Sequence, residues 1–398
     1  MHKNIKLERN AYLFSLYLVV ALFSFTLTMI GPMAPRLQKE FAMTYSLAGL
    51  HQSAYAIGMV IMGVSGAAVI KRFGLFLSVW GGIAIMLLGL FFMVISVGPA
   101  FTLGSVLFMS LGGTLAMSSA QAAFAEWQGS ARSRVILESN MMASIFTMLV
   151  PLVLLFGDRL GWSWRIVLPA MLLAAALTAL FGIPAMLKQQ HKEKCSDHSG
   201  QTEGKPLEKL FWSAWLIVFF GVSVEWALGF WCMSYLLALP NSGQRLASFG
   251  VVLLGLSAVL GRFVSSLVSS RISEKRLLII ASLAVLLGFP LYWLRIAVVP
   301  SFLGLALCGL GSSNYYPLGL SMALGRARGK ENLAASLVPV ASGSAIGLAP
   351  FLLGRIADSV DMKSALLYIP LATMVIFVLI LMDSRLDKKT RALHASSL

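Results

Sequence analysis

The chain has 398 residues, of which 58% are hydrophobic and only 12% are charged. Soluble domains carry about 25% charged residues, so a water-soluble globule cannot bury this much apolar surface, and lipid must cover part of it. The net charge of +15 would fit nucleic-acid binding in a soluble protein, but the positions of the basic residues indicate another role. Three scattered cysteines exclude a disulfide framework and a cysteine metal cluster.

Twelve long apolar segments follow one another in two groups of six. An apolar helix of about 20 residues spans the hydrocarbon core of a bilayer, and a helix satisfies every backbone amide within its own segment. We therefore predict an all-α integral membrane protein with twelve transmembrane helices in two six-helix bundles. The expected spans are 11–33, 46–70, 75–97, 101–125, 135–156, 164–187, 210–237, 247–270, 275–294, 300–324, 333–354 and 362–382.

One polar stretch, residues 188–209, separates the two groups and predicts a flexible cytoplasmic linker. It divides an N-terminal bundle, 1–187, from a C-terminal bundle, 210–398. If the N-terminus is cytoplasmic, 22 of the 31 basic residues lie in cytoplasmic segments and 8 on the opposite face. This bias follows the positive-inside rule. We therefore expect cytoplasmic termini, a multi-pass protein of a bacterial inner (plasma) membrane, and no nucleic-acid partner.

Similar short motifs recur 199 residues apart. Residues 71–74 follow the second span and residues 270–273 follow the eighth, while Leu-Gly-Gly at 111–113 in the fourth span corresponds to Leu-Gly-Ser at 310–312 in the tenth. These pairs indicate an internal duplication with parallel repeats. Such repeats are typical of transporters whose two halves rock around a central site.

The loop at 67–76 reads Ala-Ala-Val-Ile-Lys-Arg-Phe-Gly-Leu-Phe. It resembles the signature of the major facilitator superfamily, Gly-x-x-x-Asp-Arg-x-Gly-Arg-Lys, in which Arg72 and Gly74 match and Lys71 replaces the Asp. The Gly-Trp-Ser-Trp-Arg corner at 161–165 and the Gly-Arg pair at 261–262 are also similar to that family. The resemblance covers nearly the whole chain. It implies alternating access of two bundles to a small-molecule substrate.

Two further stretches resemble the fucose-permease-like branch of that superfamily. They are Gly-Val-Ser-Val-Glu at 221–225, followed by Trp231, and Arg134 followed by Glu-Ser-Asn at 138–140. Members of this branch move small solutes together with protons. The resemblance implies a membrane protein embedded in lipid that couples to protons, works as a monomer and needs no cofactor.

Two charged residues lie deep within expected spans and are the candidates for proton coupling. Glu225 lies about 22 Å into the seventh span at 1.5 Å per residue, where a carboxylate costs on the order of 3 kcal/mol. Arg262 lies about 12 Å from the cytoplasmic end of the eighth span and would bind an anionic group or set the protonation of Glu225. The structural alternatives are a hydrogen-bonded Glu between helices and an interhelical Arg clamp.

Other polar and aromatic residues of the spans are candidates for the substrate cavity, and a set near the cytoplasmic face is the candidate gate. The cavity candidates are Gln52, Tyr55, Gln121, Glu138, Asn140, Trp226, Asn314, Tyr315 and Tyr316. The gate candidates are Arg72, Gly74, Glu126 and Arg134.

We therefore predict a secondary transporter, with proton-coupled symport of a small solute as the first hypothesis. A proton-antiport exporter of a drug or metabolite is the alternative, because both use the same architecture. A polytopic membrane enzyme is the remote alternative, because four of the five histidines lie in terminal or linker segments and no HExxH pair occurs. The 20 methionines form no cluster with His or Cys, so no metal site is expected.

Overall fold

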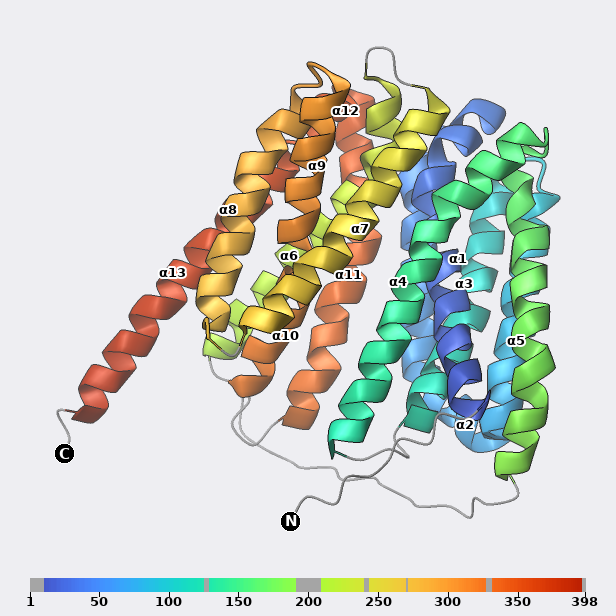
Figure 1. Cartoon of the computed structure of the whole chain (residues 1–398), viewed down its shortest axis with the longest axis horizontal. Coiled ribbons are helices and arrows are strands. Elements are labelled where there is room, and N and C mark those ends of the chain that lie inside the picture. The colour runs from blue at the N-terminus through green and yellow to red at the C-terminus, as the bar shows by residue number, and fades with distance from the viewer. Residues whose placement is uncertain are drawn as a thin grey trace. The chain divides into compact units, whose positions relative to one another are not determined.

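The computed structural model describes residues 11–124, 129–190, 209–239, 243–269, 271–326 and 331–395. Within these ranges all regular structure is helical (Figure 1). The helices are α1 (Ala11–Phe41), α2 (Tyr45–Val94), α3 (Pro99–Ala123), α4 (Gly129–Arg159), the 3-10 helix η2 (Ser163–Ile166), α5 (Val167–Gln190), α6 (Lys209–Leu237), α7 (Gln244–Val268), α8 (Glu274–Trp293), α9 (Val298–Ser312), α10 (Tyr315–Gly325), α11 (Glu331–Ser359), α12 (Met362–Ala365) and α13 (Tyr368–Ala395).

The structure confirms helices at the expected spans. Ten helices of the described ranges are long and apolar enough to cross a bilayer. The expected spans 46–70 and 75–97 both lie in α2, which bends at Gly74, where φ is 80°. Glycine alone adopts this left-handed region without a steric penalty. The expected span 300–324 is divided between α9 and α10, so the count of twelve stays a prediction.

The chain divides into two compact units that are not simply consecutive in sequence. The first unit comprises Met1–Met43 and Leu50–His198, and the second comprises Thr44–Gly49 and Ser199–Leu398. A segment of six residues from the start of α2 thus belongs to the second unit. The expected bundle boundaries, 1–187 and 210–398, stay a prediction.

Each unit is organised around its first long helix. In the first unit, α1 packs against α3, α4 and α5, and 78% of its apolar span is buried. In the second unit, α6 packs against α7, α9, α10, α11 and α13, and 67% of its span is buried. The equivalent helix is therefore central in both units, as a parallel duplication requires.

The duplication is also visible in the closest helix contacts. A Cβ added to Gly58 would lie 2.7 Å from the Cβ of Ser110 in the first unit. In the second unit, a Cβ on Gly309 would lie 2.9 Å from the Cβ of Ser257. Ser257 and Gly309 lie 199 residues after Gly58 and Ser110, so the same contact is kept while the glycine has moved to the other helix. Small residues at such crossings let helix backbones approach closely.

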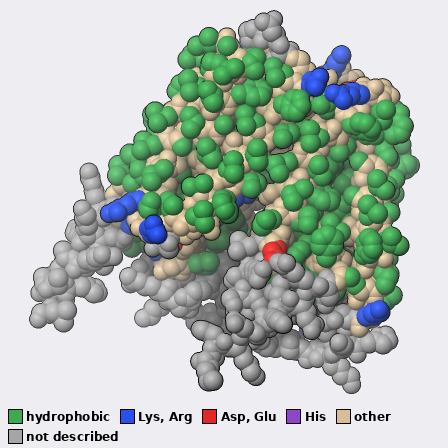
Figure 2. All heavy atoms as spheres, in the orientation of Figure 1, with side chains coloured by type: hydrophobic (Ala, Val, Ile, Leu, Met, Phe, Trp, Pro, Cys, Tyr) green, Lys and Arg blue, Asp and Glu red, His purple; other side chains and the backbone are tan. Residues whose placement is uncertain are grey.

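The surface fits a protein embedded in lipid. Large apolar side chains are widely exposed, among them Val64 at 83% and Leu287 at 70%. On the face shown in Figure 2, apolar side chains cover most of the described surface, and the coloured Lys and Arg side chains gather near helix ends. A soluble protein rarely exposes such a large apolar area. The chain is a multi-pass integral membrane protein.

A pair of glycines tests the importance of close helix packing. Ala in place of Gly89 would put its Cβ 2.5 Å from the backbone nitrogen of Met109, whereas a Cβ on Gly104 would meet nothing within 4 Å. We expect Gly89→Ala to destabilise the protein by about 1–3 kcal/mol through overpacking. Gly104→Ala should be neutral or stabilise it by about 0.5–1 kcal/mol, because Gly weakens a helix interior.

The measurement is the apparent melting temperature of the detergent-solubilised variants. A lower value for Gly89→Ala and an unchanged or higher value for Gly104→Ala is expected. Equal values for the two variants would show that the contact between α2 and α3 tolerates an extra methyl group.

Candidate functional site

The two deep charged residues predicted from the sequence form a direct ion pair in the second unit. Arg262 of α7 donates from Nη2 to Oε1 of Glu225 on α6, with an N–O distance of 2.6 Å. The Nε of Arg262 donates to the backbone carbonyl of Ser313 at 3.1 Å. The Arg262 side chain is 43% exposed and that of Glu225 is 26% exposed. Because charged groups at this depth avoid hydrocarbon, this exposure indicates access to water or a polar ligand.

The local sequence explains how Arg262 reaches its partners. The preceding residue, Gly261, packs so closely on the end of α9 that a Cβ there would lie 2.4 Å from the carbonyl oxygen of Leu310. Glycine therefore brings the α7 backbone against the junction of α9 and α10, where Ser313 lies. Arg262 then bridges this junction and Glu225. At 1.5 Å per residue the two residues lie about 22 and 12 Å into their spans, so a direct pair requires both side chains to extend towards each other.

Four more predicted cavity residues lie in the second unit. Trp226 and Tyr316 are half-buried. Asn314 is buried, and its Nδ2 donates to the Leu310 carbonyl at 2.8 Å, while its Oδ1 has no partner among the described atoms. Tyr315 is fully buried, and its hydroxyl donates to the Ser282 Oγ at 3.4 Å. Asn314 thus lies next to the Arg262 contact, whereas Tyr315 packs between helices.

The predicted cavity residues of the first unit have different surroundings. Gln52 is fully buried, and neither polar atom of its amide has a partner in the described part of the chain. Tyr55 is also buried and shares a hydrogen bond of 2.9 Å with Thr26. Gln121 and Asn140 are exposed. A buried amide without partners is costly, so Gln52 is the residue of this set that most needs a polar ligand.

Glu138 is the carboxylate among the predicted cavity residues. It is half-buried on α4 and accepts a hydrogen bond of 2.9 Å from the Tyr17 hydroxyl of α1. The two helices pack against each other in the first unit. This hydrogen bond therefore links two packed helices through polar side chains.

The predicted cytoplasmic gate is only partly described. Arg72 is exposed, and its guanidinium lies 5.5 Å from the centre of the Phe73 ring. Gly74 provides the bend in α2. Glu126 lies outside the described residues, and Arg134 lies in α4 with a side chain outside the described part. The gate therefore stays a prediction.

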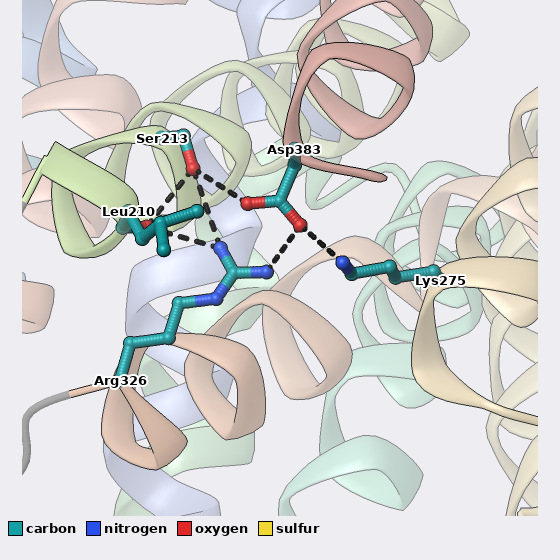
Figure 3. A network of polar contacts seen from close by, with 5 residues as sticks. All are labelled: Leu210, Ser213, Lys275, Arg326 and Asp383. Carbon is teal, nitrogen blue, oxygen red and sulfur yellow. Dashed lines mark hydrogen bonds and ion pairs between the residues drawn. The ribbon is translucent and has the colours of Figure 1, made fainter. Parts of the chain in front are cut away.

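A buried charge cluster was not anticipated from the sequence (Figure 3). The Oδ2 of Asp383 lies 2.5 Å from Nη2 of Arg326 and 2.7 Å from Nζ of Lys275. Its Oδ1 accepts from Ser213 at 3.2 Å, and Arg326 Nη1 also donates to the Leu210 carbonyl at 3.0 Å. Asp383 has no exposed side-chain surface. The cluster joins α6, α8 and α13 to the residue that follows α10.

The sequence holds only a weak signal for this cluster. Asp383 is the first acidic residue after the apolar run of α13. Lys275 and Arg326 are among the 22 basic residues that lie in the expected cytoplasmic segments. Arg326 and Asp383 are 57 positions apart in the sequence, and Lys275 and Ser213 are farther still from Asp383. These residues therefore meet only through the fold.

A second unanticipated contact holds the beginning of α2 within the second unit. The carboxylate of Asp358 on α11 accepts hydrogen bonds from the backbone nitrogens of Tyr45 and Ser46, both at 2.8 Å, and from the Ser46 hydroxyl. A Cβ on Gly354 would lie 2.5 Å from the Tyr45 carbonyl oxygen. A carboxylate at a helix N-terminus accepts hydrogen bonds from the free amides there and interacts favourably with the positive end of the helix dipole. Here the cap comes from a residue more than 300 positions away.

The described residues contain no group of three or more His, Cys, Asp or Glu side chains that could hold a metal ion. The carboxylate–guanidinium pair of Glu225 and Arg262 is partly exposed.

Comparisons with known proteins agree on the fold. A family model described as Major Facilitator Superfamily matches residues 16–330. The structure resembles a bacterial homologue of the human lysosomal transporter Spinster in an inward-facing and occupied conformation, with a TM-score of 0.72, 14% identity, and coverage of 93% of this chain and 97% of that one. It also resembles the transporter FucP in the outward conformation, with a TM-score of 0.61, 18% identity, and coverage of 94% and 99%. The comparison with curated proteins finds no match.

The buried cluster gives a prediction about stability. Asp383→Asn removes the negative charge and leaves Arg326 and Lys275 facing each other. Breaking a buried ion pair costs about 3–5 kcal/mol, so the apparent melting temperature in detergent should fall clearly. Asp361→Asn is the matched control, because Asp361 caps α12 at the surface and Asn caps helices as well as Asp. A similar small effect for both variants would contradict a structural role for the cluster.

Proposed function

The chain belongs to the Major Facilitator Superfamily, and from this premise we propose that it moves a small solute by proton-coupled symport. Its fold matches transporters solved in inward and outward conformations, which is the fold of alternating access. Glu225 carries the coupling proton, and Arg262 responds to its protonation.

The observation that carries the proposal is the partly exposed ion pair between α6 and α7. Its N–O distance is 2.6 Å, and the side chains of both residues are partly exposed. A carboxylate that is both paired with a cation and accessible can take up a proton from water. Once protonated, Glu225 no longer attracts Arg262, so the pair has two states that a proton selects.

The packing of Arg262 connects these two states to the helices around it. The Nε of Arg262 stays bonded to Ser313 at the junction of α9 and α10, whereas Nη2 is released when Glu225 is neutral. Protonation thus changes the contact between α6 and α7 while the contact between α7 and α9 is kept. A local change in interhelical contacts of this kind biases a protein that alternates between two conformations.

The proposal includes the remaining predictions about the site. Gln52, Asn314, Trp226 and Tyr316 contribute polar or aromatic contacts to the substrate, with Tyr55, Gln121, Glu138, Asn140 and Tyr315 as further cavity residues. The gate consists of Arg72, Gly74, Glu126 and Arg134. The protein acts as a monomer in a bacterial inner membrane, with both termini in the cytoplasm. The excess of basic residues on the cytoplasmic side supports this orientation.

The test is reconstitution into liposomes and a screen of candidate solutes under an imposed proton gradient. Wild-type protein should accumulate its substrate against a concentration gradient. Glu225→Gln should lower this accumulation to about equilibrium, because a neutral amide cannot carry the proton, while exchange of substrate across the membrane continues. Accumulation by Glu225→Gln at the wild-type level would refute the proton-carrier role.

The matched control is Glu274→Gln. Glu274 lies in the first turn of α8 and accepts from the Ser321 hydroxyl, so the variant removes a carboxylate of the second unit away from the ion pair. Its accumulation should equal that of the wild type. Substrate efflux driven by inward proton movement would identify the antiport exporter instead of a symporter.

A further inference from the structure

Arg262 has hydrogen-bond donors that the protein does not use. A guanidinium carries five N–H donors. One on Nη2 bonds to Glu225 and the one on Nε bonds to Ser313, while Nη1 has no hydrogen-bond partner within the described ranges. Because 43% of the side chain is exposed, a small solute can reach it.

The charge balance around Arg262 depends on Glu225. Among the described residues, this carboxylate is the ion-pair partner of Arg262. When Glu225 is protonated, the guanidinium has no anionic neighbour among the described side chains, and an uncompensated cation within a membrane span is costly.

The other helices packed against the pair do not supply a replacement anion. The described acidic side chains of α11 and α13 are engaged elsewhere, Asp358 with Tyr45 and Ser46 and Asp383 with Arg326 and Lys275. The other described titratable side chains of the helices around the pair are the basic Arg355 of α11 and a set of thiols and phenols, which are neutral at physiological pH. The thiols and phenols are Cys232 and Tyr235 of α6, Cys308 of α9, Tyr315 and Tyr316 of α10 and Tyr368 of α13.

We propose that the transported solute carries a carboxylate, which docks on Arg262 in place of the protonated Glu225. The inference rests on the proposed symport and names its substrate class. A substrate carboxylate presents the same two oxygens as Glu225 and matches the planar fork of the guanidinium. Binding of the anion and binding of the proton then favour each other, because each restores the neutrality that the other disturbs. One proton and one carboxylate cross together without net charge.

Chemical labelling of the full-length protein tests the docking step without a transport assay. Phenylglyoxal modifies accessible arginines, and mass spectrometry measures the rate at Arg262 and, as the control, at the exposed Arg245 near the start of the same helix. In Glu225→Gln, Arg262 should react several-fold faster than in the wild type. Acetate should slow this reaction several-fold at matched ionic strength, and its uncharged isostere acetamide should not.

The labelling results are decisive in both directions. Equal rates at Arg245 in the wild type and in Glu225→Gln show that the variant keeps its fold. Acetate protection no greater than that by acetamide, or slow labelling of Arg262 in both proteins, would overturn the proposed carboxylate site.

Uptake by proteoliposomes tests the substrate class. The panel consists of small carboxylic acids, each with its amide and its amine counterpart, under an inwardly directed proton gradient. Uptake limited to the acids, and reduced several-fold in Arg262→Gln, supports the inference. Uptake of amides or amines without the acids overturns the inference but leaves a transporter. If the wild type takes up none of the compounds, the result counts against the proposed function itself. The labelling experiment then tests only whether Arg262 binds a carboxylate.

Discussion

Close contact between helix backbones at small residues supports both the packing of the units and the geometry of the ion pair. Lipid is as apolar as a leucine side chain, so helices in a bilayer associate by close packing and polar contacts. Gly89 against Met109 and Gly261 against Leu310 are such contacts. The second one places Arg262 where it can reach both Ser313 and Glu225. The packing of α7 on α9 therefore determines which charges meet.

The second unit contains two groups of paired charges with different surroundings. Asp383 is fully buried between two cations, and both of its carboxylate oxygens are bonded. Glu225 has a single cationic partner and remains partly exposed. The first arrangement suits a permanent connection between helices, and the second suits a bond that opens and closes.

The sequence was sufficient to predict the helices and the deep charges, but not their contacts. Glu225 and Arg262 are recognisable because charged residues are rare within apolar spans. Their pairing depends on how α7 lies against α6 and α9, which depth along a straight helix does not reveal. The repeat of Gly58 and Ser110 as Ser257 and Gly309 is invisible to a motif comparison, because the small residues change places between helices. The cap of α2 by Asp358 is equally hidden, since helix caps are normally sought next to the helix in sequence.

The assignment of Thr44–Gly49 to the second unit has a consequence for the autonomy of the two halves. A chain severed between residues 191 and 208 would yield a C-terminal fragment without these six residues. The carboxylate of Asp358 would then lose its hydrogen bonds from the amides of Tyr45 and Ser46, and Gly354 would lose its packing contact with Tyr45. The C-terminal fragment would therefore lack the backbone amides that Asp358 caps and the segment that packs on Gly354.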